Sequence, residues 1–147
     1  MANPAITRFA RTLIATVVPE APFQPTIGVL FQSKDLPEVW STLEFSDAAN
    51  QRLTIGTRAI WREFGSFSIV LLGKSGFGTD ALLMLGQRVT DKLQDMQERL
   101  LEYNGISGTL RLDSVGVPNT EDYEDGNWLI TTVACVYTYD SVRGAAV

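Results

Sequence analysis

The 147-residue sequence contains no histidine and a single cysteine, Cys135. Without histidine, neither a Ser-His-Asp nor a Cys-His catalytic arrangement can form, and the commonest zinc ligand is missing. One cysteine excludes a disulfide within the chain and a cysteine-based metal site. Because Cys135 lies in the apolar stretch LITTVACVYTY, we expect a thiol buried in a strand rather than a reactive one. Any catalysis would have to use carboxylates, lysine or tyrosine.

The chain also lacks a long apolar run and a positive net charge. No hydrophobic run approaches the roughly 20 residues of a membrane-spanning helix, and the N-terminal segment does not have a secretory layout, so we expect a cytosolic product. Residues 1–74 carry seven Lys/Arg and six Asp/Glu, whereas residues 75–147 carry five and eleven, and these balances of +1 and −6 give the net charge of −5. Such a chain should not bind nucleic acid by neutralising phosphates.

What is present is an ordinary globular composition, with 45% hydrophobic residues in a chain long enough to bury one core. Asn3-Pro4 predicts the start of a helix that ends before Pro19. A longer helix is predicted from Thr79 or Asp80, either of which would cap it, to the Tyr103-Asn104-Gly105 stretch. Its apolar residues have helical spacing: Leu82, Leu85, Val89, Leu93, Met96 and Leu100.

Alternating apolar and polar residues predict the strands. They cover residues 39–45, 53–61, 67–72, 106–113 and 128–139, with a hairpin turn at 64–66, a turn at 46–51 and a loop at 117–127. The last strand is apolar on both faces, so it needs a covering layer on each side. With two helices available, a second subunit would supply part of that cover. The expected fold class is α+β, a single domain over residues 1–147. A mixed or antiparallel sheet of about four to five strands would be packed by an N-terminal helix and one long central helix.

The stretch FSIVLLGKSGFGTDALLML (67–85) has the outline of a nucleotide-binding loop. Its GFGTDA segment matches the relaxed dinucleotide fingerprint, and its GKS resembles the end of a phosphate-binding loop. However, the first glycine of a phosphate-binding loop is replaced by Ser68, inside a predicted strand. No strand ends in an acid at the spacing that ribose binding requires. We therefore interpret the segment as a turn followed by a helix start.

Two further groups of charged residues are candidate sites. The acidic run 121–125 has the wrong spacing for a calcium loop, which favours a solvated loop. Arg58, Arg62 and Arg111 lie on polar strand faces near three acids, which predicts cross-strand ion pairs or an inter-subunit role; these acids are Glu44, Glu63 and Asp113. The three tryptophans, Trp40, Trp61 and Trp128, lie in predicted strands, where core or interface packing is favoured over ligand stacking.

The order of these elements resembles that of the tail terminator proteins of long-tailed bacteriophages. The resemblance rests on an N-terminal helix, a proline-rich connector, the PEVWSTLEF strand, the segment RLTIGTRAIWREFGSFSIVLLGKSGFGTDALL, a long amphipathic helix and the closing GNWLITTVACVYTYD strand. REFGSFS (62–68) is similar to the family's hairpin, which has an R-x-x-G-x-F-S pattern and leads into G-x-G and a helix. Residues 19–36 match the family least.

The resemblance implies a structural virion protein with no enzymatic activity and no cofactor or metal. Such proteins form a ring, typically a hexamer, which caps the growing tail tube, stops its polymerisation and joins the tail to the head. The implied partners are copies of itself, the tail tube protein, head–tail connector proteins, and double-stranded DNA that passes through the channel without tight binding; no membrane is implied. The implied location is the head-proximal end of the tail in the virion, after assembly in the host cytoplasm.

Under this hypothesis the charged residues have expected places. The candidate inter-subunit surface contains Arg58, Arg62, Glu44 and Arg111. The candidate lumen or docking loop contains Glu121, Asp122, Glu124 and Asp125, and the acids Asp91, Asp95 and Glu98 of the predicted helix are further lumen candidates. Alternatives from other classes are a connector or tail-completion protein on the head side of the junction, a small enzyme that uses carboxylates, and an adaptor.

Overall fold

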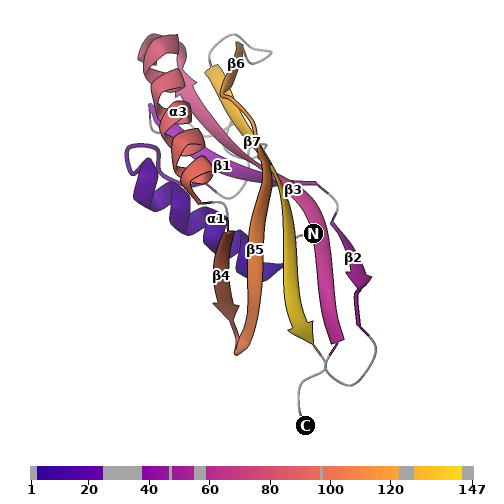
Figure 1. The fold of residues 1–147 in the computed structure, drawn as a ribbon. Helices are drawn as coiled ribbons and strands as arrows, with labels where there is room; N and C mark the ends of the chain where they lie inside the picture. The colour runs from indigo at the N-terminus through magenta and orange to yellow at the C-terminus, as the bar shows by residue number, and fades with distance from the viewer. Residues whose placement is uncertain are drawn as a thin grey trace.

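The computed structural model describes residues 3–24, 38–46, 48–54, 59–96, 98–122 and 128–143. Within these ranges, two helices and seven strands make one α+β fold, as predicted, but the sheet is larger than predicted (Figure 1). The elements are α1 (Pro4–Val17), β1 (Val39–Phe45), β2 (Ala49–Arg52), β3 (Ala59–Lys74), the 3-10 turn η1 (Ser75–Phe77), α3 (Thr79–Asp95), β4 (Glu98–Tyr103), β5 (Ile106–Val115), β6 (Asn119–Asp122) and β7 (Trp128–Arg143).

Strands β3 and β7 are the two long members of the sheet. Each has 16 residues, and they pair antiparallel along their whole length, from Ala59 opposite Arg143 to Lys74 opposite Trp128. The strand order is β1-β3-β7-β5-β4, with β2 also paired to β3 and β6 to β7. Figure 1 shows these two strands running through most of the molecule, with β6 near one end and β4 toward the other.

Helix α1 begins where the sequence predicts. The Asn3 side chain accepts a hydrogen bond from the Ala5 N–H, and Pro4 occupies the first helical position, where a missing N–H costs nothing. Helices α1 and α3 bury their apolar stripes against one face of the sheet, which contributes Phe67, Ile69, Val133 and other residues to the main core. Cys135 belongs to this core, as predicted.

A second, smaller apolar cluster lies on the opposite face of the sheet, at one end of β3 and β7. It consists of Trp40, Val70, Leu72 and Trp128, with Ile130 packed against it. The rings of Trp40 and Trp128 meet edge to face, with centroids 6.0 Å apart. The final strand is therefore buried on both faces at this end, in agreement with its two-sided apolar pattern.

The predicted hairpin turn at 64–66 is wrong, because β3 is continuous through it. Gly65 lies directly opposite Tyr137, and a Cβ on Gly65 would come 2.7 Å from the Tyr137 hydroxyl oxygen. The glycine makes room for a cross-strand ring and does not mark a turn. The predicted strand 53–61 is also wrong: the Leu53 N–H donates to the Ile60 carbonyl (2.8 Å), so these residues lie on two segments that face each other.

The central helix ends earlier than predicted. It stops at Asp95, and residues 98–103 form β4, so Leu100 lies in a strand and is 73% exposed. Asn104 and Gly105 both have positive φ, 51° and 77°, which is the geometry of a two-residue hairpin turn rather than of a helix cap. Leu100 continues the helical spacing only by coincidence.

Two other local predictions need correction. The first helical residues of α3 are Thr79 and Asp80 themselves, and the N-cap is Gly78, with φ of 99° and no side-chain cap. Asp80 is still favourable in the first turn because of the helix dipole. Parts of the predicted turn at 46–51 and loop at 117–127 are strands, β2 and β6, whose polar sequences show no alternating apolar pattern.

Candidate interaction surface

The face of β3 and β7 that lies away from the helices, here called the open face, carries the even-numbered residues of both strands. This follows from strand geometry, since successive side chains alternate between the two faces. The register brings these residues into cross-strand pairs: Ile60 with Val142, Arg62 with Asp140, Phe64 with Thr138, and Ser66 with Val136. The open face is therefore a mixture of apolar and charged side chains on adjacent strands.

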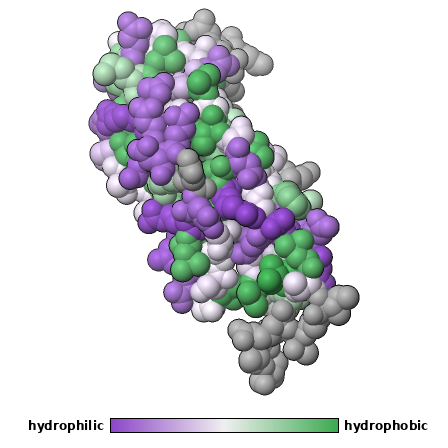
Figure 2. Space-filling view, in the orientation of Figure 1, coloured by the Kyte–Doolittle hydropathy of each residue, from purple (hydrophilic) through white to green (hydrophobic). Residues whose placement is uncertain are grey.

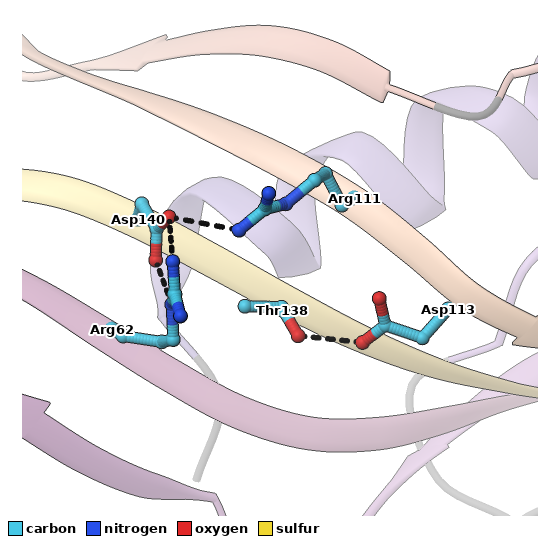
Figure 3. Close-up of polar contacts among 5 residues, drawn as sticks. All are labelled: Arg62, Arg111, Asp113, Thr138 and Asp140. Carbon is cyan, nitrogen blue, oxygen red and sulfur yellow. Dashed lines mark hydrogen bonds and ion pairs between the residues drawn. The ribbon is translucent and has the colours of Figure 1, made fainter.

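Asp140 is held by two arginines from the strands on either side of β7. Arg62 of β3 makes a two-point contact, with Nε 2.7 Å from Oδ1 and Nη2 2.9 Å from Oδ2. Arg111 of β5 donates from Nη2 to Oδ2 at 3.1 Å. Figure 3 shows the three side chains converging on this face, with a helix behind the sheet. This arrangement crosslinks three strands and leaves one excess positive charge.

The electrostatics of the cluster follow from these contacts. Hydrogen bonds from Arg62 lower the pKa of Asp140, and although burial opposes this, the charges of Arg62 and Arg111 lower it further. The same hydrogen bonds raise the pKa of Arg62. Asp140 is therefore ionised near neutral pH, and the cluster is a permanent feature there.

A second polar contact extends the cluster along β5. The hydroxyl of Thr138 donates to Oδ2 of Asp113. The register between β5 and β7 shifts between Leu112 and Ser114, and this irregularity places Asp113 next to Thr138 (Figure 3).

Apolar side chains flank this polar cluster. Ile60, Phe64, Val136 and Val142 lie on the open face and are 36 to 47% exposed. In the space-filling view, hydrophobic surface lies beside a hydrophilic band in the half of the molecule that holds these strand ends (Figure 2). These four apolar side chains lie on both sides of the charged Arg62–Asp140 row. Exposed apolar side chains grouped on one face favour a surface that another protein covers, whereas single exposed residues need no explanation.

Glu63 is not part of the ion-pair cluster, although the sequence pattern placed it among the partners of the arginines. It lies on the helix side of β3, is 4% exposed, and accepts a hydrogen bond from the Tyr137 hydroxyl at 2.6 Å. The Asn3 N–H also donates to it, at 3.3 Å. Burial, followed by this hydrogen bond, raises the pKa of Tyr137. Glu63 therefore connects the start of α1 to the middle of the sheet.

The other candidate residues are distributed over several elements. Glu44 is exposed in β1, opposite Ser68. Asp91 and Asp95 are exposed in α3, but Glu98 is in β4 and not in a helix. Backbone pairing places Glu121 and Asp122 in β6, opposite Ile130 and Leu129. Arg58, Glu124 and Asp125 lie outside the described residues.

Of the predicted inter-subunit residues, the structure brings together Arg62 and Arg111, through a third residue that the sequence pattern missed. Asp140 is the only acid in the 128–143 segment, and it follows Thr138 on the same alternating face. Its position was a usable signal, but the predicted strand ended one residue before it.

The glycine-rich segment after β3 forms a turn and a helix start, as interpreted from the sequence. Lys74 is the last residue of β3 and is exposed, and η1 leads through Gly78 into α3. Within the described ranges, no group of three or more His, Cys, Asp or Glu side chains is placed to hold a metal ion. No helix in these ranges is long and apolar enough to cross a membrane.

The sequence matches no model of a known protein family, and no curated protein shows significant similarity to it.

Proposed function

We propose that this chain is a structural protein that assembles into a closed ring, ends a bacteriophage tail tube and provides the surface that joins the tail to the head. The observation that carries the proposal is the open face. A single copy leaves Ile60, Phe64, Val136 and Val142 exposed around the Arg62–Asp140–Arg111 cluster. Neighbouring copies in a ring would cover these side chains.

The polar cluster is compatible with burial between subunits. Asp140 already accepts hydrogen bonds from both arginines within one chain. Pairing with Asp140 reduces the cost of burying the two arginines, although one excess positive charge remains, and the flanking apolar side chains supply the favourable term. An interface that joins two different surfaces of the same chain forms a ring of fixed size when the rotation between neighbours closes, and such a ring is a finite assembly.

The negative charge suits a channel through which DNA slides. The net charge is −5, and Asp91 and Asp95 are exposed on α3. Acids that face the lumen would repel phosphates, so DNA would pass without sticking. Reversing both charges should slow DNA passage. An unchanged rate of DNA ejection would show that these residues do not line the lumen.

The test of the proposal is a tube-capping assay. Purified protein is added to polymerising tail tube protein, and tube lengths and ends are measured by negative-stain electron microscopy. We expect ring-shaped density at one end of each tube and no further growth from that end. Continued growth with bare ends would overturn the proposal. Binding to portal complexes without binding to tubes would move the protein to the head side of the junction.

Matched variants connect the assay to the open face. Phe64→Glu and Val136→Glu place carboxylates on the open face near its arginines, which the isolated subunit should tolerate. Both should abolish capping. Met84→Glu is the control, because Met84 is exposed on α3, away from this face. Loss of capping with all three variants, or with none, would contradict a role for the open face.

A further inference from the structure

A groove separate from the open face lies between α1, the C-terminal end of α3 and β4. It has a volume of about 470 Å³. Its apolar lining includes Phe9 and Leu13 of α1, together with Met96 and Leu101, which pack on the edge of the main core. Leu101 lies there because β4 turns its odd-numbered side chains toward the helices, like Leu110 of β5, which belongs to the main core.

The rim of this groove is basic in an otherwise acidic protein. Arg8, Lys92 and Arg99 line it and are exposed, and among its described lining residues Glu102 is the one acid. None of the three cations has an ion-pair partner in the part of the chain that the structure describes. By contrast, Arg62, Arg88 and Arg111 are all paired. Unpaired cations around an apolar floor fit a partner that is both acidic and aromatic or apolar.

The geometry points to the acidic segment of a second copy of this chain as the occupant of the groove. Residues 121–125, EDYED, place four carboxylates around one tyrosine. The carboxylates complement Arg8, Lys92 and Arg99, and the tyrosine ring suits the apolar floor. This inference rests on the proposed ring and identifies one of its subunit contacts.

The described part of this segment, Glu121 and Asp122 of β6, lies far from the groove of its own chain. Glu121 lies opposite Ile130 of β7, whereas Arg99 lies opposite Leu110, which lies opposite Tyr139 of β7. Nine residues of strand separate these two rows, or roughly 30 Å at about 3.3 Å per residue. Figure 1 shows β6 and β4 in opposite halves of the molecule. The contact is therefore made between two copies, and when such contacts run head-to-tail and the rotation between neighbours closes, they generate a ring.

A peptide experiment tests the contact without requiring a ring. A fluorescently labelled peptide of residues 118–127, PNTEDYEDGN, is titrated with the full-length protein at low salt, and binding is followed by anisotropy. We expect saturable binding that weakens severalfold as salt screens the charges. The double variant Lys92→Glu/Arg99→Glu should weaken it by about tenfold or more. The control Arg52→Glu/Lys74→Glu changes the net charge equally outside the groove and should leave binding unchanged.

Two outcomes of this titration would overturn the inference. One is equal binding of a peptide in which the four acids are replaced by their amides, since charge would then play no part. The other is no binding of the acidic peptide up to about 1 mM, the weak limit of specific association. Binding of a labelled DNA duplex in place of the peptide would assign the groove to phosphates and would equally overturn the inference.

An assembly experiment separates this inference from the proposed function. Reversing the acids (Glu121→Lys, Asp122→Lys, Glu124→Lys and Asp125→Lys) or the groove (Lys92→Glu and Arg99→Glu) should each reduce ring formation on tail tubes, and combining both sets should restore it. Unchanged ring formation in both sets of variants would refute the groove contact but would not refute the proposed ring. Peptide binding in the groove without capping of tubes would leave the contact standing and refute the proposed function.

Discussion

Replacing Gly108 by alanine tests whether the sheet depends on space reserved for a tyrosine ring. A Cβ on Gly108 would come 2.3 Å from both Cζ and Oη of Tyr139, a side chain that is 1% exposed and has nowhere to move. Overpacking of this kind costs about 1–3 kcal/mol. The lost flexibility of the unfolded chain stabilises by about 0.4–1 kcal/mol. Overpacking should win, with a loss in Tm of about 2–8 °C for a chain of this size.

The sign of the effect should reverse when the ring is removed. In Tyr139→Leu, the three tyrosine atoms nearest the new methyl group are gone. Gly108→Ala should then stabilise by about 0.5–1 kcal/mol, because only the chain-entropy effect remains. Urea unfolding of the four proteins in this double-mutant cycle measures the coupling. Gly76→Ala is the control, with no atom within 4 Å of the added Cβ, and should be neutral or mildly stabilising. An effect of the same sign and size in both backgrounds would refute the reasoning.

Three further predictions concern titratable groups. Arg62 lowers the pKa of Asp140, so the contribution of this carboxylate to stability is present above its unfolded pKa of about 3.9 and is lost as pH falls through the folded value. In unfolding experiments at different pH values, the stability advantage of the wild-type protein over Asp140→Asn should therefore shrink below about pH 4. A stability difference that does not change with pH would contradict this. Tyr137→Phe leaves buried Glu63 without its 2.6 Å hydrogen bond and should cost about 1–3 kcal/mol in urea unfolding, so an unchanged midpoint would show that the bond is dispensable. Burial, and then the charge of a nearby carboxylate, raises the pKa of Cys135 to about 12, so a thiol reagent at pH 8 should modify it only after unfolding; rapid reaction in the native state would disprove its burial.

The sequence predicts some elements well because their signals are local. Asn3-Pro4 starts α1, and the two-sided apolar pattern of residues 128–139 predicts a strand that is covered on both faces. The helix prediction failed at its end, where Leu100 prolonged the apolar spacing while Asn104-Gly105 signalled a hairpin. Two patterns overlapped there, and the turn residues were the better guide.

The glycines also show that local sequence does not determine every backbone conformation. Gly65 looked like a turn residue, yet it lies in the middle of β3 because Tyr137, 72 positions later in the chain, occupies its Cβ space. Nothing in the neighbouring residues carries that information. A glycine that allows a close approach and a glycine that allows a turn are alike in sequence, and the pairing partner distinguishes them.

Local chemistry in the chain is thus enough for the fold class, the start of α1, the start of α3 to within two residues, the buried thiol and the excess of acid in the second half. Those properties depend on neighbours within a few residues. Three other features depend on folding: the order β3-β7-β5, the convergence of Arg62 and Arg111 on Asp140, and the placement of basic side chains around an apolar groove. Arg62 and Asp140 are 78 positions apart, and an ion pair of that span exists only once packing of the whole sheet has chosen which strands are neighbours.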